Sequence, residues 1–140
     1  KVDKKNYYEK SFNLGIPQVN LGKLKDKIFG IENNLDELGG IDFKKGCYIG
    51  QENTSRIKLR NKLRRRILPI KKISGKILEN DIIKYKDMEI GKIVIDKPYS
   101  FGLIKVVDPD IKEFINTELS CGTSKVKILK PEWIVWLIIN

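Results

Sequence analysis

The sequence predicts an α+β protein in which a partly helical N-terminal part precedes a small antiparallel β-barrel. In the second half of the chain, short runs of β-branched residues recur at regular spacing between turn residues, which is typical of a small closed barrel. In the first half, residues 51–60 favour helix, and Asn, Asp and Gly gather in residues 33–40. We place the boundary at Asn61, between residues 1–60 and 61–140.

The N-terminal part has clear start and stop signals. Residues 1–10 are polar and predict a short helix that ends near Gly15 and Pro17. Residues 21–29 then alternate apolar with basic side chains, and residues 33–40 have loop and turn chemistry.

A loop at residues 45–52 combines a thiol, an aromatic ring and two glycines. Its candidate site residues are Lys45, Gly46, Cys47, Tyr48, Gly50, Gln51 and Glu52. The glycines permit a tight loop that presents Cys47 just before a helix, whose N–H groups and dipole stabilise an anion. With nearby Lys44 and Arg56, this setting increases the thiolate fraction, so we predict a reactive thiol. The alternative is a small buried hydrophobic residue.

The same loop, followed by Ser55-Arg56, resembles the signature of the YgfZ family of folate-binding proteins. Those proteins are similar to the glycine-cleavage T-protein and act in iron-sulfur cluster assembly or repair. The flanks agree with the resemblance: residues 14–17 resemble the family's G-I-P turn, and residues 32–36 resemble its E-A-N-L-D segment. Residues 39–43 then lead into the signature as they do in the family.

The resemblance implies that residues 1–60 are the C-terminal portion of a T-protein-like folate-binding domain and that residues 61–140 are the barrel beside it. It also implies tetrahydrofolate, or a folate derivative, as cofactor. Lys1 is not an initiator methionine, and the resembling proteins are longer on the N-terminal side. We therefore expect a C-terminal fragment, with the N-terminal half of the same protein as the partner that completes the folate pocket.

Glu32 is a candidate cofactor-binding residue because of its position in the resemblance. Acidic side chains of folate-binding relatives grip the aminopyrimidine edge of the pterin, where a carboxylate accepts two N–H bonds. The alternative for Glu32 is an ordinary solvated glutamate.

The basic run at residues 56–72 supplies the other cofactor candidates, because it holds nine basic and no acidic residues. Arg65 lies where T-protein relatives carry an arginine near the folate, and a shift of register would substitute Arg64 or Arg66. With Arg56, these residues predict an anion-binding wall for the glutamate tail of folate. The alternative is a solvated face with long apolar stems.

The barrel begins with a predicted strand over residues 66–73, in which Pro69 calls for an edge or a bulge because proline has no N–H to donate. The further predicted strands are residues 82–85, 90–95, 101–107 and 126–129. Cys121 is expected to be structural. The apolar residues 133–139 predict a final strand or docking segment, being far fewer than the ~20 residues that span a bilayer. We therefore expect no membrane partner.

Composition bounds the chemistry. The formal charge of +10 favours anionic partners. The 140 residues contain no histidine, which excludes histidine triads, bases and ligands within them. Two cysteines, Cys47 and Cys121, are too few for a closed zinc site or a four-cysteine cluster, so we expect no metal ligated by this chain alone. They suit a reducing compartment, the cytoplasm or, in a eukaryote, the mitochondrial matrix.

The resemblance implies a folate-binding accessory protein in iron-sulfur cluster assembly or repair, with Cys47 as the reactive group and assembly machinery or client proteins as partners. One alternative is a folate-dependent aminomethyltransferase, although T-proteins have no cysteine at the matching position. We expect an accessory protein rather than a classical enzyme. A second alternative is an RNA- or tRNA-associated module, although aromatic residues are sparse between Tyr48 and Tyr85 and no P-loop occurs.

Overall fold

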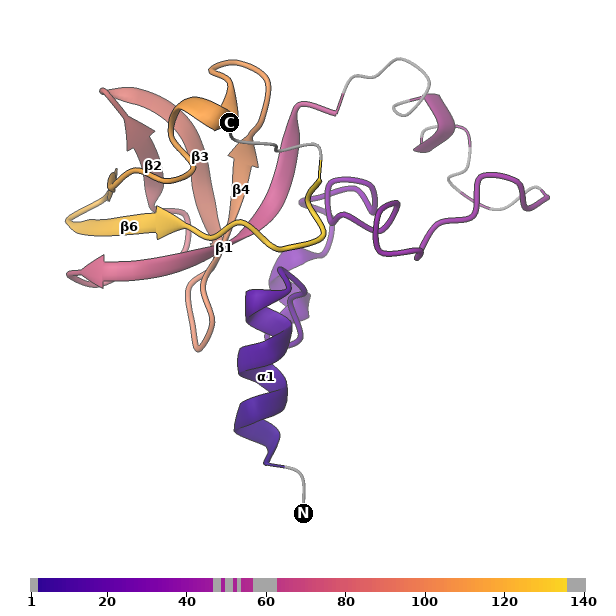
Figure 1. The fold of residues 1–140 in the computed structure, drawn as a ribbon, viewed down its shortest axis with the longest axis horizontal. Helices are drawn as coiled ribbons and strands as arrows, with labels where there is room; N and C mark the ends of the chain where they lie inside the picture. Colours follow the sequence, from indigo (N-terminus) through magenta and orange to yellow (C-terminus); the bar gives the residue numbers. More distant parts are fainter. Residues whose placement is uncertain (1–2, 47–48, 50–51, 53, 57–62, 136–140) are drawn as a thin grey trace.

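The computed structural model describes residues 3–46, 49, 52, 54–56 and 63–135. Six strands of this part form a closed antiparallel barrel, and the N-terminal segment packs against its side (Figure 1). The strands are β1 (Arg65–Ser74), β2 (Ile82–Tyr85), β3 (Met88–Ile95), β4 (Phe101–Lys105), β5 (Leu119–Cys121) and β6 (Ser124–Ile128). The predicted α+β class and antiparallel barrel are confirmed.

The strand order around the barrel is β1–β4–β3–β2–β5–β6. Strand β1 closes it, because its first half pairs with β4 and its second half with β6. The change of partner falls at Pro69, where the next amide, that of Ile70, donates to the Ser100 carbonyl at 2.9 Å. The prediction of an edge or bulge at Pro69 is therefore wrong: the irregularity in β1 lies between Lys72 and Ser74.

The barrel interior holds the larger apolar core. Every strand contributes to it, and so does the turn after the short 3₁₀ helix η2 (Ile111–Glu113), which inserts the fully buried Phe114 and Ile115. Gly91 lets β3 and β4 approach closely, because a Cβ on it would lie 2.5 Å from the Leu103 carbonyl oxygen. Dense packing of this kind leaves no room for an additional methyl group.

A second apolar cluster covers the outer face of β1, β3 and β4. Side chains alternate across a strand, so Ile67 of β1 points out of the barrel while its neighbour Leu68 joins the interior core. Against Ile67 and its neighbours pack Leu24 of the 3₁₀ helix η1 (Leu21–Leu24) and Phe12 of α1 (Lys4–Asn13). Helix α1, as predicted, ends before Gly15, and it extends away from the barrel (Figure 1).

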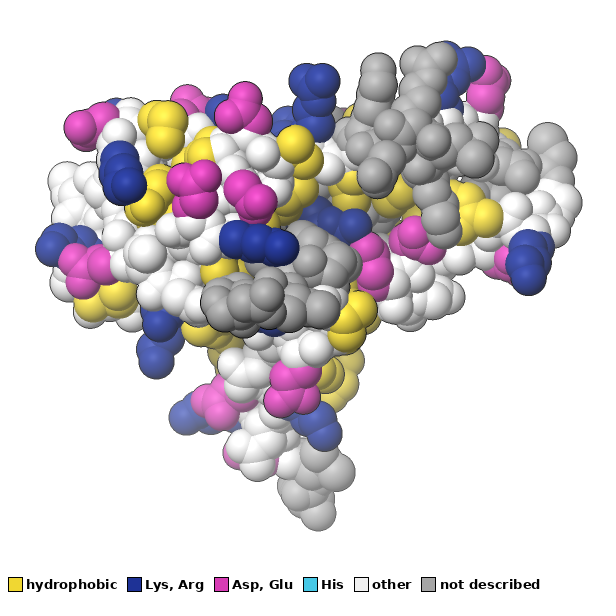
Figure 2. All heavy atoms as spheres, turned by 45° about the horizontal axis from the view of Figure 1, so that its top comes forward, with side chains coloured by type: hydrophobic (Ala, Val, Ile, Leu, Met, Phe, Trp, Pro, Cys, Tyr) yellow, Lys and Arg dark blue, Asp and Glu magenta, His cyan; other side chains and the backbone are white. Residues whose placement is uncertain are grey.

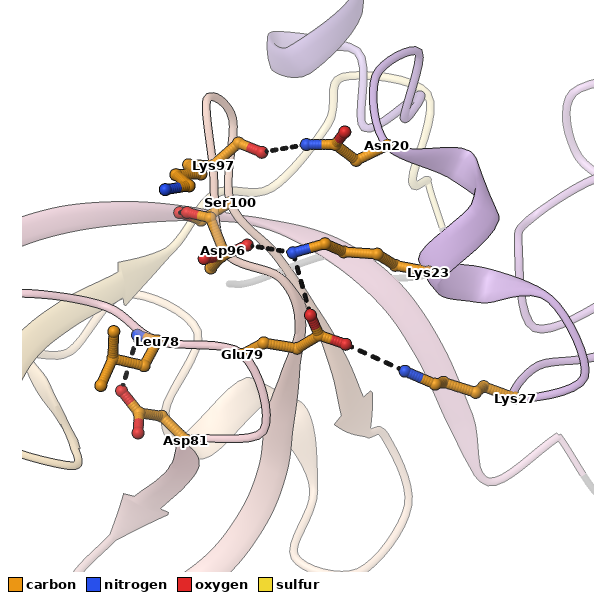
Figure 3. Close-up of polar contacts among 9 residues, drawn as sticks. All are labelled: Asn20, Lys23, Lys27, Leu78, Glu79, Asp81, Asp96, Lys97 and Ser100. Carbon is orange, nitrogen blue, oxygen red and sulfur yellow. Dashed lines mark hydrogen bonds and ion pairs between the residues drawn. The ribbon is translucent and has the colours of Figure 1, made fainter.

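An ionic cluster fastens η1 to the barrel (Figure 3). The Lys23 amine donates to Asp96 Oδ1 at 2.6 Å and lies 2.9 Å from Glu79 Oε2, while Lys27 donates to Glu79 Oε1 at 3.0 Å. The pKa of Lys23 is raised mainly by its hydrogen bond to Asp96 and, to a smaller extent, by its hydrogen bond to Glu79. Conversely, the hydrogen bond from Lys23 is the main cause that lowers the pKa of Asp96 and of Glu79.

The C-terminal segment returns to α1 rather than forming a strand in its described part, which ends at Val135. The Trp133 indole N–H donates to the Leu14 carbonyl at 2.7 Å, and Ile134 is fully buried. The docking alternative for this segment is therefore the correct one as far as Val135. No helix within the described ranges is long and apolar enough to cross a membrane.

Candidate anion-binding site

The predicted cysteine loop is described only in part. Four of its residues lie outside the described part of the chain, namely Cys47, Tyr48, Gly50 and Gln51. Lys45 and Gly46 are exposed, and Ile49 is fully exposed. Glu52 and Arg56, both in helical conformation, form an exposed ion pair one turn apart. The reactivity of Cys47 and the roles of its loop neighbours therefore stay predictions.

Glu32 and Arg65, two of the cofactor candidates, bind each other. Glu32 Oε1 accepts from Arg65 Nε at 3.0 Å and lies 2.9 Å from Nη2, while Glu32 Oε2 accepts from the Phe29 backbone amide at 2.9 Å. The Glu32 side chain is 8% exposed, whereas that of Arg65 is 44% exposed. Both carboxylate oxygens are thus engaged, and the pair orients the Arg65 guanidinium at the protein surface.

The loop around Glu32 is docked on β1 by neighbouring polar contacts. The Glu32 carbonyl accepts from the Ile67 amide at 2.9 Å, and the fully buried Asn34 side chain donates to the Ile67 carbonyl at 2.9 Å. Asn34 Oδ1 in turn accepts from Arg66 Nη1 at 3.0 Å, and Arg66 also pairs with Glu37. Arg66 is therefore a docking residue, 11% exposed, rather than a surface cation.

A basic pocket of about 550 Å³ opens at the start of β1. It is lined by Arg64, Arg65, Lys105, Val107 and Asp108. Arg65 and Lys105 are direct partners in the β1–β4 pairing, so the sheet itself brings their side chains together. Lys105 donates to the Glu89 carbonyl at 2.9 Å, and Arg64 is exposed and forms no ion pair with any described residue.

Among the described lining residues, Arg64 and Lys105 form no ion pair, so this pocket is suited to an anion. A guanidinium presents paired N–H groups that match a carboxylate or a phosphate, and the Glu32 contact holds one of the two arginines in place. Lys105, Val107 and Asp108 were not candidates from the sequence. The signal that would have found them is the register of β1 against β4, which a single sequence does not contain.

The other cysteine, Cys121, is fully buried in β5. Burial, with a smaller effect of the nearby Asp81 carboxylate, raises its thiol pKa to about 11, so the thiolate is scarce at neutral pH. This agrees with the predicted structural role. No group of three or more Cys, Asp or Glu side chains in the described ranges is placed to hold a metal ion.

Basic and acidic side chains are mixed on one face of the molecule. On the face shown in Figure 2, Lys and Arg side chains are interspersed with Asp and Glu.

Comparison with known proteins adds to this geometry. The chain is 33% identical over 115 residues to a Neurospora crassa protein described as "Iron-sulfur cluster assembly factor IBA57 homolog, mitochondrial". The matched region covers 81% of this chain and 24% of the relative. The chain resembles iron-sulfur cluster assembly factors. Proteins of the same description match in Phaeosphaeria nodorum, at 42% over 74 residues, and in Dictyostelium discoideum, at 46% over 80 residues. These two matches cover 53% and 57% of this chain.

The chain spans about a quarter of the length of the Neurospora crassa relative, and 18% and 17% of the other two. No family model matches the chain. The relatives' description names iron-sulfur cluster assembly, as the resemblance of the cysteine loop implied. It does not name folate, so folate binding stays a prediction.

Proposed function

We propose that this chain belongs to the YgfZ-like folate-binding family and serves in iron-sulfur cluster assembly. The observation that carries the proposal is its similarity to assembly factors over 81% of its length. The cysteine-loop signature supports it independently from the residues themselves. The cluster is then cargo that the protein helps to build, and the relatives' description favours the mitochondrion over the cytoplasm.

Folate is the proposed cofactor, and part of the described site fits it. The pocket lined by Arg64, Arg65 and Lys105 suits the negatively charged glutamate tail. Glu32 fits the pterin less well, because its two oxygens already accept from Arg65 and from the Phe29 amide. We therefore propose that Arg64 and Lys105 contact the tail directly and that Glu32 is a positioning residue for Arg65.

Cys47 is the proposed reactive group. A thiolate is both a nucleophile and an iron ligand, and the predicted position before a helix favours the thiolate form. We propose that it acts with the assembly machinery or client proteins during cluster transfer. Lys45, Glu52 and the rest of the loop shape its surroundings.

A replacement experiment tests the assembly role. In cells that lack the endogenous protein, the full-length protein carrying Cys47→Ser is expected to leave [4Fe-4S] enzymes inactive, because serine supplies no thiolate. The matched control is Cys121→Ala, since the buried thiol has no proposed chemistry. Full enzyme activity with Cys47→Ser would remove the thiol from the mechanism, and normal activity without any copy of the protein would overturn the assembly role.

A separate titration tests folate. Tetrahydrofolate binding to the full-length protein is expected to weaken about tenfold in Arg64→Ala, the loss of one charge-assisted contact of ~1.4 kcal/mol. Lys25→Ala is the control, because Lys25 is exposed and does not line the pocket. Equal affinities in both variants would place folate elsewhere.

A further inference from the structure

A second hollow, which the proposed function does not use, opens on the barrel. It is a groove of about 400 Å³ between the second half of β1, the loop after β1 and the loop that joins β3 to β4. Its apolar lining comes from Phe12, Ile70, Ile77, Pro98 and Tyr99. We call it the lysine groove, because four lysines also line it.

These lysines are Lys71, Lys72, Lys76 and Lys97, and all four are exposed. Within the described part of the chain, none of them forms an ion pair. Asp96, the one carboxylate among the described residues that line the groove, is bound by Lys23 at 2.6 Å on the η1 side. In Figure 3 the side chain of Lys97 extends away from that cluster. The groove thus carries four positive charges that no described carboxylate neutralises.

Two like charges face each other across β1 and β6 beside the groove. Lys71 of β1 stands directly opposite Lys127 of β6, and like charges at directly opposed positions of an antiparallel pair are destabilising. The next pair of the same strands joins Lys72 with Val126, so this lysine has no cation directly opposite it. Local rules are broken in this way most often where a surface has a function.

Internal contacts hold the loop that forms one wall of the groove. Ser100 Oγ donates to the Asp96 carbonyl at 2.6 Å, and Asn20 Nδ2 donates to the Lys97 carbonyl at 2.7 Å. The Tyr99 ring packs on Phe12, with centroids 5.5 Å apart. A ligand would therefore pay little to order this loop, and preordered surfaces bind more tightly for the same contacts.

We propose that the lysine groove binds an acidic peptide segment, bearing apolar side chains, of a partner protein. Charge complementarity selects an anionic occupant, and the apolar lining selects one that also buries side chains. Lysine suits this use, because its ammonium is a flexible point charge that meets carboxylates without requiring one fixed geometry. The inference does not depend on folate or on Cys47.

A nucleic acid is the disfavoured occupant. Phosphates would satisfy the lysines but leave the apolar lining unused unless bases stacked on it. The Tyr99 ring, the aromatic side chain nearest to the lysines in sequence, already contacts Tyr8 and Phe12, so its faces are partly occupied. None of the described residues that line the groove is an arginine, whose paired N–H groups would grip phosphate.

Fluorescence anisotropy on the full-length protein tests the proposal. The probe is a fluorescein-labelled ten-residue peptide of glutamates with a central leucine and phenylalanine. Saturable binding is expected, and the double variant Lys72→Glu/Lys76→Glu should weaken it about tenfold or more, since each reversed charge turns attraction into repulsion. The matched control is Lys25→Glu/Lys112→Glu, which makes the same change of net charge at exposed sites outside the groove and should shift the affinity less than about twofold.

Two further probes sharpen the result. A peptide with serine in place of the leucine and phenylalanine is expected to bind about tenfold more weakly, because it buries no apolar side chain. A ten-nucleotide oligothymidylate is expected to bind more weakly than the acidic peptide. Equal loss in both lysine double variants, equal affinity of the serine peptide, or preference for the oligonucleotide would each overturn the proposal.

Discussion

Arg64 and Arg65 are adjacent arginines whose surroundings differ completely. Arg65 holds the carboxylate of Glu32, which is 8% exposed, whereas Arg64 forms no ion pair with a described residue. Both line the same pocket. Their contributions to stability and to binding should therefore separate, although the two side chains are chemically identical.

Arg65→Ala is expected to lower the free energy of unfolding by about 2 kcal/mol, because it leaves a nearly buried carboxylate with only the Phe29 amide as partner. Arg64→Ala, the matched control, is expected to change it by less than about 0.5 kcal/mol. Urea unfolding followed by circular dichroism measures both. Equal stabilities would show that the Glu32–Arg65 pair does not hold the loop on β1.

The buried thiol of Cys121 makes a prediction about alkaline pH. Its pKa is raised from 9.0 to about 11 by burial, so between these values the unfolded chain has lost a proton that the folded chain retains. Stability from this group is therefore complete below pH 9 and is lost as pH rises towards 11.

Cys121→Ala removes this titration. It is expected to lower the melting temperature at pH 8, because it leaves a small cavity, and the deficit relative to the natural chain should shrink between pH 9 and pH 11. Thermal melts at a series of pH values measure this difference, which cancels the titration of lysines and tyrosines. A deficit that stays constant with pH would mean that the thiol is accessible to water.

At the scale of elements, β1 is the strand on which both the barrel closure and the basic pocket depend. It pairs with β4 and β6, its outer face receives η1, and its start lines the basic pocket. The neighbouring contact of β3 with β4 depends on Gly91, where any side chain would meet the Leu103 carbonyl. The geometry of the barrel at the pocket thus depends on backbone approach as well as on side chains.

Gly91→Ala is expected to destabilise the fold by about 2 kcal/mol, because the added methyl group forces β3 and β4 apart. Gly22→Ala is the control, since a Cβ there meets nothing within 4 Å. Chemical denaturation of both variants gives the comparison. If Gly91→Ala were as stable as the control, the close approach of the two strands would be incorrect.

At the scale of the whole molecule, long-range contacts join the N-terminal segment to the barrel. Lys23 bonds Asp96 and Glu79, Trp133 bonds the Leu14 carbonyl, and the outer apolar cluster takes residues from both parts. Because these contacts cross between the parts, we expect the described structure to unfold as one unit.

Lys23→Met is expected to lower the melting temperature and to speed amide hydrogen exchange over residues 20–28. Asp96 and Glu79, whose pKa values are lowered from 3.8 and 4.5, stabilise the fold above those pH values, and this stabilisation is lost in acid. Lys23, whose pKa is raised from 10.5, stabilises the fold below pH 10.5, and this stabilisation is lost in strong alkali.

The difference in melting temperature between the natural chain and Lys23→Met should therefore be largest between about pH 5 and pH 10, and should shrink as the pH falls below 3.8. Lys25→Met, an exposed neighbour, is the control and is expected to show no such profile. A pH-independent difference would mean that Lys23 acts through packing and not through its charge.

Much of the barrel could be predicted from the sequence because strands rich in β-branched residues are bounded by turn residues. Residues 82–85 match β2 at both ends, and residues 101–107 contain β4. Strand β5 was missed, since Leu119–Cys121 is only three residues long, too short for its alternation of buried and exposed side chains to be detected. It forms because β2 and β6 offer it backbone partners on both sides.

The sequence indicated some of the residues of the candidate site, but not how they lie relative to one another. Glu32 and Arg65 were both candidates, but their mutual bond joins residues 33 positions apart, and local sequence patterns do not reach that far. Lys105 entered the pocket only through the register of β4 on β1. The lysine groove likewise appears only when β1 and the loop after β3 are brought together.

The sequence by itself determined the fold class, the positions of most strands, the short helix and the motif that resembles a family, because these depend on local propensity and periodicity. The tertiary structure alone decided which charges are paired and which are free. A charge is neutralised by what lies beside it in space, so Arg65, Arg66 and Lys23 became structural while Arg64 and the groove lysines stayed available for partners.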